Sequence, residues 1–131
     1  MMLWGSMPRP GTSRVSFETV RKMALSLPGV EEGVSYGTPA FRVGGAFLAR
    51  LKEDGDSLAL RMGFEDRERL MASRPEAFYL TDHYRDYPAV LVRLSSVSVQ
   101  GLREALELGW RKAAPAKLQK GKGSRRGRRT P

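Results

Sequence analysis

The pair Gly44-Gly45 constrains the fold more than any other feature of the sequence. It separates two β-prone runs, residues 41–43 and 46–51. Two glycines between such runs are typical of a two-residue β-hairpin, because glycine adopts positive φ at both turn positions without steric strain. The two runs are therefore predicted to be neighbouring strands of a mainly antiparallel sheet.

The other periodic segments predict the element order α-β-β-β-α-β-β-α. Ser16 is an expected N-cap for a helix that ends at Pro28-Gly29, and Ser98 for a last helix that reaches about Lys112. A short helix is predicted over 65–73, strands over 57–62, 77–80 and 89–94, and a loop over 31–39. The expected fold class is α+β, a two-layer sandwich whose five-stranded sheet carries its helices on one face.

The net charge of +9 is concentrated at the C-terminus. After residue 116 there are seven basic residues and no acid, and the first 116 residues hold 16 basic and 14 acidic ones. We therefore expect a disordered extension over 1–15, a nearly neutral domain over 16–116 and a disordered basic tail over 117–131. The tail cations are expected to attract nucleic-acid phosphates: Lys117, Lys120, Lys122, Arg125, Arg126, Arg128 and Arg129.

Strand alternation places one arginine of each of four strands on a single face of the sheet. With the larger apolar set inward, including Phe47, the outward set contains Arg42, Arg50, Arg61 and Arg93, together with Ala46, Leu48, Ala59 and Leu91. In one interpretation the arginine stems only cover an open face while their charged groups stay in water. In the other, the face is a basic platform for phosphates or for an acidic partner.

Two motifs that resemble catalytic ones are interpreted as structural. Gly33-Val34-Ser35-Tyr36-Gly37 matches the G-x-S-x-G pattern, but that serine needs a strand before it and a helix after it. His83 is the only histidine, with Asp82 and Asp86 nearby as orienting carboxylates and no activated nucleophile. We therefore expect no catalytic residue, no metal site and no cofactor.

Four stretches in order resemble the MmcQ/YjbR family. They are Leu25–Glu32, Tyr36–Gly45 with Phe47, Leu80–Tyr84, and the closing helix with Trp110 and Pro115. The resemblance covers about residues 16–118. It implies a compact α/β sandwich similar to the frataxin-like and secretion-chaperone-like folds, and a DNA-binding role that is described for the family by analogy of fold.

The sequence therefore predicts a non-catalytic, cytoplasmic, DNA- or RNA-binding protein, monomeric or weakly dimeric, that holds phosphates on the sheet arginines and the tail. The absence of cysteine and of any long apolar run agrees with a cytoplasmic location without membrane attachment. Two alternatives stay open. One is a protein-binding or chaperone-like module, and the other is a small-molecule binder or enzyme centred on Ser35 and His83.

Overall fold

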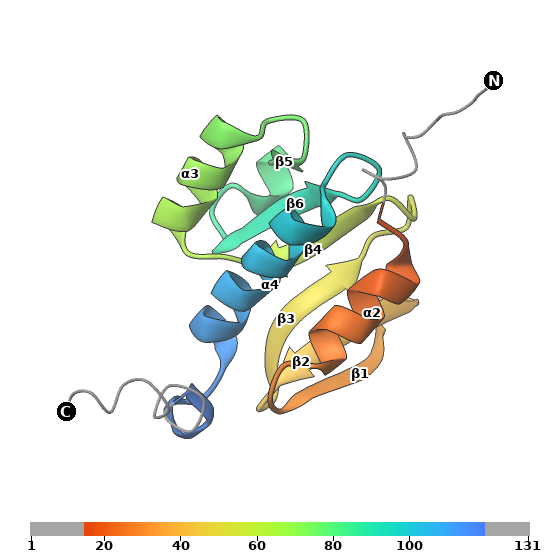
Figure 1. Ribbon diagram of the computed structural model, residues 1–131, viewed down its shortest axis with the longest axis vertical. Coiled ribbons are helices and arrows are strands. Elements are labelled where there is room, and N and C mark those ends of the chain that lie inside the picture. The colour runs from red at the N-terminus through yellow and green to blue at the C-terminus, as the bar shows by residue number, and fades with distance from the viewer. Residues whose placement is uncertain (1–14, 120–131) are drawn as a thin grey trace.

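A six-stranded sheet forms one layer of the structure, in the order β1-β2-β3-β4-β6-β5 with every neighbouring pair antiparallel (Figure 1). The computed structural model describes residues 15–119. The strands are β1 Val30–Ser35, β2 Thr38–Val43, β3 Ala46–Leu51, β4 Ser57–Arg61, β5 Phe78–Tyr79 and β6 Ala89–Arg93. The predicted antiparallel α+β architecture is confirmed, with one strand more than expected.

Helices α2 (Phe17–Leu25) and α4 (Val99–Ala113) cover one face of this sheet, and α3 (Phe64–Ser73) packs beside β5 and β6 (Figure 1). Both predicted N-caps are present. The Ser16 and Ser98 hydroxyls accept hydrogen bonds from backbone N–H groups three residues on. Each bond satisfies one of the N–H groups that a helix start leaves without an internal partner.

The core lies between the two covering helices and the sheet. Trp110 of α4 is its largest fully buried side chain, and its indole Nε1 donates to the Pro28 carbonyl at 2.8 Å. That bond fixes the C-terminal half of α4 to the turn that follows α2. The apolar side chains of the sheet that meet the helices include Phe41, Val43, Leu48, Leu58, Leu60, Val90 and Val92.

Strand β1 replaces most of the loop predicted over 31–39. Within the described residues it is an edge strand that pairs with β2 alone, and Glu31, Glu32 and Gly33 give it little β propensity. Its pairing is set by the turn Tyr36-Gly37, where φ is +54° and +81°. Two positive φ values suit a tight hairpin whose twist matches that of its strands. The geometry of the turn therefore accounts for the pairing of β1 with β2, which the composition of β1 does not indicate.

A β-bulge in the β2–β3 pair reverses the predicted orientation at three positions, Ala46, Phe47 and Leu48; Ala46 lies opposite Val43, whose side chain is in the core. Phe41 lies opposite Ala49 and Arg42 lies opposite Phe47, so Leu48 is the extra residue. Leu48 is therefore fully buried in the core, and Phe47 lies on the outward face. The prediction that Phe47 faces inward and Leu48 outward is wrong, because strict alternation fails where one residue is added to a strand.

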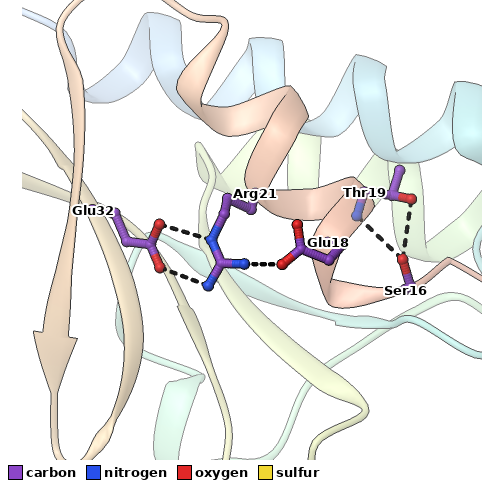
Figure 2. Close-up of polar contacts among 5 residues, drawn as sticks. All are labelled: Ser16, Glu18, Thr19, Arg21 and Glu32. Atoms are coloured by element: carbon purple, nitrogen blue, oxygen red, sulfur yellow. Dashed lines mark hydrogen bonds and ion pairs between the residues drawn. The ribbon is translucent and has the colours of Figure 1, made fainter.

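An ion pair joins α2 to the edge strand β1. The Arg21 guanidinium donates to both carboxylate oxygens of Glu32, at 2.9 and 3.0 Å, and also contacts Glu18 one turn earlier (Figure 2). The hydrogen bond from Arg21 lowers the pKa of the Glu32 carboxyl below its ordinary value. This two-pronged contact supports an edge strand that has few apolar contacts of its own.

The domain extends slightly beyond the predicted boundaries. Val15, expected in the N-terminal extension, is buried and donates its backbone N–H to the Leu94 carbonyl. Leu118, expected in the tail, packs against the core near Gly29. The remaining predictions for residues 1–14 and 120–131, including six of the seven tail cations, lie outside the described residues. Within 15–119, every helix is too short or too polar to cross a bilayer.

The contact between α4 and β4 depends on Gly109. A Cβ atom there would lie 2.5 Å from the Arg61 carbonyl oxygen and 3.1 Å from Cδ1 of Leu60. We expect Gly109→Ala to destabilise the fold by about 1–3 kcal/mol through overpacking, despite the better helix propensity of alanine. Thermal unfolding checks this. Gly33→Ala is the matched control, because a Cβ there meets no atom within 4 Å. An unchanged melting temperature for Gly109→Ala would disprove the close approach.

Candidate ligand-binding cleft

A cleft of about 720 Å³ opens on the sheet face that α2 and α4 do not cover. Strands β2, β3 and β4 supply its floor. The turn after β1 and the segment before β6 supply its sides, and that segment contains the 3₁₀ turn η1 (Asp82–Tyr84). Four cations line it, with five aromatic or imidazole rings and one carboxylate: Arg42, Arg50, Lys52 and Arg61; Tyr36, Phe47, His83, Tyr84 and Tyr87; and Glu53.

Arg50 is the most deeply held of the four cations. Its side chain is 11% exposed, and Nη1 donates to Thr38 Oγ1 at 2.9 Å and contacts Glu53 Oε2 at 3.4 Å. The Tyr36 ring lies over its guanidinium, 5.1 Å from Cζ to the ring centroid. These contacts hold Arg50 in one orientation, which reduces the entropy lost when a ligand binds to its remaining N–H groups.

Arg61 and Arg42 present N–H groups to the other end of the cleft. Nε of Arg61 donates to the Phe47 carbonyl at 2.8 Å, which fixes the guanidinium beside the bulge. Arg42 lies opposite Phe47 and is exposed. No carboxylate within residues 15–119 lies within 4 Å of either guanidinium. Both therefore keep donors that suit a phosphate or carboxylate.

Two carboxylates moderate the positive charge. Glu53 contacts Arg50, and its own backbone N–H and then the Arg50 charge lower the pKa of this carboxyl, so Glu53 is ionised at neutral pH. Glu31 of β1 lies directly across the ladder from Arg42. Because 31–39 was predicted as a loop, the sequence analysis did not place this carboxylate on the sheet beside Arg42.

Arg93 lies apart from the other three sheet arginines. Its partner in the ladder is Ser57, at the opposite end of β4 from Arg61. Its guanidinium stacks on Tyr79, 4.2 Å from Cζ to the ring centroid, and Nε contacts the Glu76 carbonyl at 3.3 Å. The structure thus brings Arg42, Arg50 and Arg61 to one cleft and leaves Arg93 outside it.

Part of the outward face is covered and offers no binding surface. Ala59 and Leu91, predicted to be exposed beside the arginines, are each 1% exposed. Tyr79 bonds to Ser57 and stacks on Arg93 there, and the Lys52 ammonium lies 5.2 Å from the Tyr84 ring centroid. The accessible part of this face is therefore a cleft with walls, and Ala59 and Leu91 do not contribute to its surface.

A buried arginine that the sequence analysis missed holds the wall of the cleft. Arg67 of α3 is 5% exposed, and its two Nη atoms donate to four backbone carbonyls at 2.8–3.3 Å. The acceptors belong to the segment that forms the wall: Tyr84, Arg85, Tyr87 and Ala89. Phe64 covers the guanidinium, 4.7 Å from Cζ to the ring centroid. Only its position in the amphipathic pattern of α3, as a charge on the inward side, could have indicated this role.

Ser35 and His83, separated by almost fifty residues, both line the cleft. No hydrogen bond joins them in the part of the chain that the structure describes, and His83 packs edge-on against Tyr84 at 4.9 Å between ring centroids. Ser35 is the last residue of β1, and a two-residue turn and another strand follow it. The strand-to-helix turn that an activated serine requires is therefore not built here.

Metal binding finds no support in the described residues. Within 15–119 no group of three or more His, Cys, Asp or Glu side chains comes together in a way that could hold an ion. The cationic lining of the cleft would also repel a cation.

The fold and the site thus define a class of protein: an antiparallel α+β domain with a basic, aromatic cleft on the sheet face that α2 and α4 leave open. A sequence model of the YjbR family matches residues 25–112. The chain belongs to the YjbR family.

Two uncharacterized proteins and one solved structure are similar to this chain. The uncharacterized proteins Rv2570 of Mycobacterium tuberculosis and Mb2600 of Mycobacterium bovis are each 37% identical over 65 residues, which is 49% of this chain and 50% of theirs. The match thus spans about half the length of these curated relatives. Protein DR2400 of Deinococcus radiodurans, a DUF419 domain, superposes with a TM-score of 0.60 at 23% identity, over 76% of this chain and 77% of that one. That likeness concerns the fold alone.

Arg67 should be required for the wall of the cleft. We expect Arg67→Met to cost about 1–3 kcal/mol of stability, because each of the four carbonyls loses a donor and a buried polar group left unsatisfied costs about that much; the Tyr84 and Tyr87 carbonyls keep a backbone donor. Amide hydrogen exchange should also accelerate over 84–89. Arg69→Met is the control, since Arg69 is exposed and pairs only with Asp66 one turn away; its effect should stay within about 0.5 kcal/mol. Equal effects of the two substitutions would contradict the role of Arg67.

Proposed function

We propose that this protein is a non-catalytic nucleic-acid-binding module that holds phosphates in the sheet-face cleft. The observation that carries the proposal is the charge of the cleft lining. The lining contains four cations and one carboxylate, and this carboxylate already contacts Arg50. DNA or RNA is the partner that offers both a line of phosphates and flat rings.

The state of the arginines supports this proposal. Arg61 is fixed through its Nε and Arg50 through Nη1, so each still has donors to offer from a defined position. Guanidinium groups bind phosphate with two parallel hydrogen bonds, and such charge-assisted bonds are roughly twice as strong as neutral ones. Arg42 adds an exposed positive charge at the edge of the cleft.

The place where the basic tail leaves the domain also supports it. Pro115 packs on the β2–β3 hairpin, where a Cβ at Gly44 would lie 2.6 Å from its Cγ, and Leu118 packs at Gly29. The chain therefore leaves the described domain beside the hairpin that follows Arg42. The tail cations begin with the exposed Lys117, and they can add non-specific affinity to a strand that passes Arg42.

A small anionic ligand with a flat ring is the second candidate. The cleft volume of about 720 Å³ falls in the range of roughly 300–1,000 Å³ that small-molecule sites occupy. Ser35 and His83 at its rim could contact such a ligand by hydrogen bonds. A basic tail would then have a separate role.

Salt-dependent binding tests the proposal. We expect Arg42→Gln/Arg61→Gln in the full chain to weaken binding to a labelled oligonucleotide. The slope of log affinity against log salt should become shallower by about 0.7–0.9 for each phosphate that the variant no longer neutralises. Fluorescence anisotropy over a salt series gives both quantities.

Arg103→Gln/Arg111→Gln is the matched control, since it removes the same charge from exposed positions of α4 on the other layer. The control should bind like the wild type apart from a small uniform decrease in affinity. If the two double variants bind equally, the cleft is not the phosphate site and the tail is the only nucleic-acid element.

A further inference from the structure

The geometry points to an unpaired nucleotide of a single strand as the occupant of the cleft, with its phosphate on Arg42 and Arg61 and its base against the tyrosines of the walls. This inference rests on the proposed function and narrows it, because it excludes double-stranded nucleic acid as the preferred partner.

Two exposed tyrosines face the cleft from its two sides. Tyr36, in the turn after β1, is 85% exposed, and Tyr87, before β6, is 57% exposed. Among residues 15–119, Val34 is the only other large apolar or aromatic side chain that is more than half exposed. An exposed aromatic ring beside a cationic group is a common feature of surfaces that bind nucleic acid by stacking.

Cations lie against the rings within the cleft. Arg50 stands under Tyr36 at 5.1 Å, and Lys52 stands against Tyr84 at 5.2 Å. Tyr36 is 85% exposed, so its contact with Arg50 leaves ring surface for another partner. Because rings alternate with cations, a nucleic-acid strand can place successive bases on the rings and phosphates on the cations. Such binding needs no hydrogen bonds to the edges of the bases.

The dimensions of the cleft favour an unpaired base. The walls rise from β2 and β6, which are three strand spacings apart, or about 14 Å. A duplex keeps its bases stacked inside, and extracting one costs a few kcal/mol, so its phosphates could touch only the rim. A single strand exposes the π-face of every base and can enter.

The experiment compares ring-removing with ring-keeping variants in the full chain. Tyr36→Leu/Tyr87→Leu removes both rings and keeps apolar bulk, whereas Tyr36→Phe/Tyr87→Phe keeps the rings. Anisotropy measures the affinity of each for a fluorescein-labelled single-stranded DNA and for the same DNA annealed to its complement. Unlabelled adenosine 5′-monophosphate serves as competitor. Circular dichroism confirms that both variants fold.

We expect the wild type and the Phe variant to bind the single strand tighter than the duplex. The affinity of the Leu variant should fall about 10-fold or more on the single strand, as expected when stacking rings are removed, and little on the duplex. Equal duplex and single-strand affinity, or equal Leu and Phe variants, would overturn the inference while the arginine test of the proposed function still stands. Competition by the monophosphate at the same nucleotide concentration would overturn it in favour of a free nucleotide.

Discussion

The buried guanidinium of Arg67 is the interaction on which the shape of the cleft depends. Burying a charge costs several kcal/mol, and within the described residues no carboxylate offsets it here. Four carbonyl oxygens do so instead, all from residues 84–89. The segment that leads from η1 to the start of β6 is thereby held against α3 and stands as a wall beside the sheet. The cleft exists because this wall stays in place.

A second constraint is the bulge in β3, which determines the side chains that the floor of the cleft exposes. The extra residue sends Leu48 into the core and brings Phe47 out beside Arg42. The Phe47 carbonyl then accepts the Arg61 Nε–H at 2.8 Å. One irregularity therefore supplies both an apolar surface and a fixed guanidinium. Such local departures from a regular ladder are common where a sheet forms a binding site.

The sequence predicted those parts of the fold that depend on local chemistry. Gly44-Gly45 indicated the β2–β3 hairpin, and Ser16 and Ser98 indicated two helix starts. Strand β1 was missed because its residues have weak β propensity and its pairing follows from positive φ at Tyr36. Three of the four predicted arginines share one cleft, and Arg93 does not, because it sits at the other end of its ladder. The wall that Arg67 holds was not predicted, because the pattern of α3 shows only a charge on its inward side and does not reveal the backbone carbonyls that this charge binds.

Nuclear magnetic resonance of arginine side chains tests the central claim most directly. The Nε–H of Arg61 is bonded to a carbonyl and so should exchange slowly enough to be observed. When labelled full-length protein is titrated with a single-stranded oligonucleotide, the account predicts shifts at Arg61 Nε and at the backbone amides of Tyr36 and Tyr87. Arg103 on α4 should stay unchanged. Saturation with shifts confined to residues after 116, and none in the cleft, would contradict it.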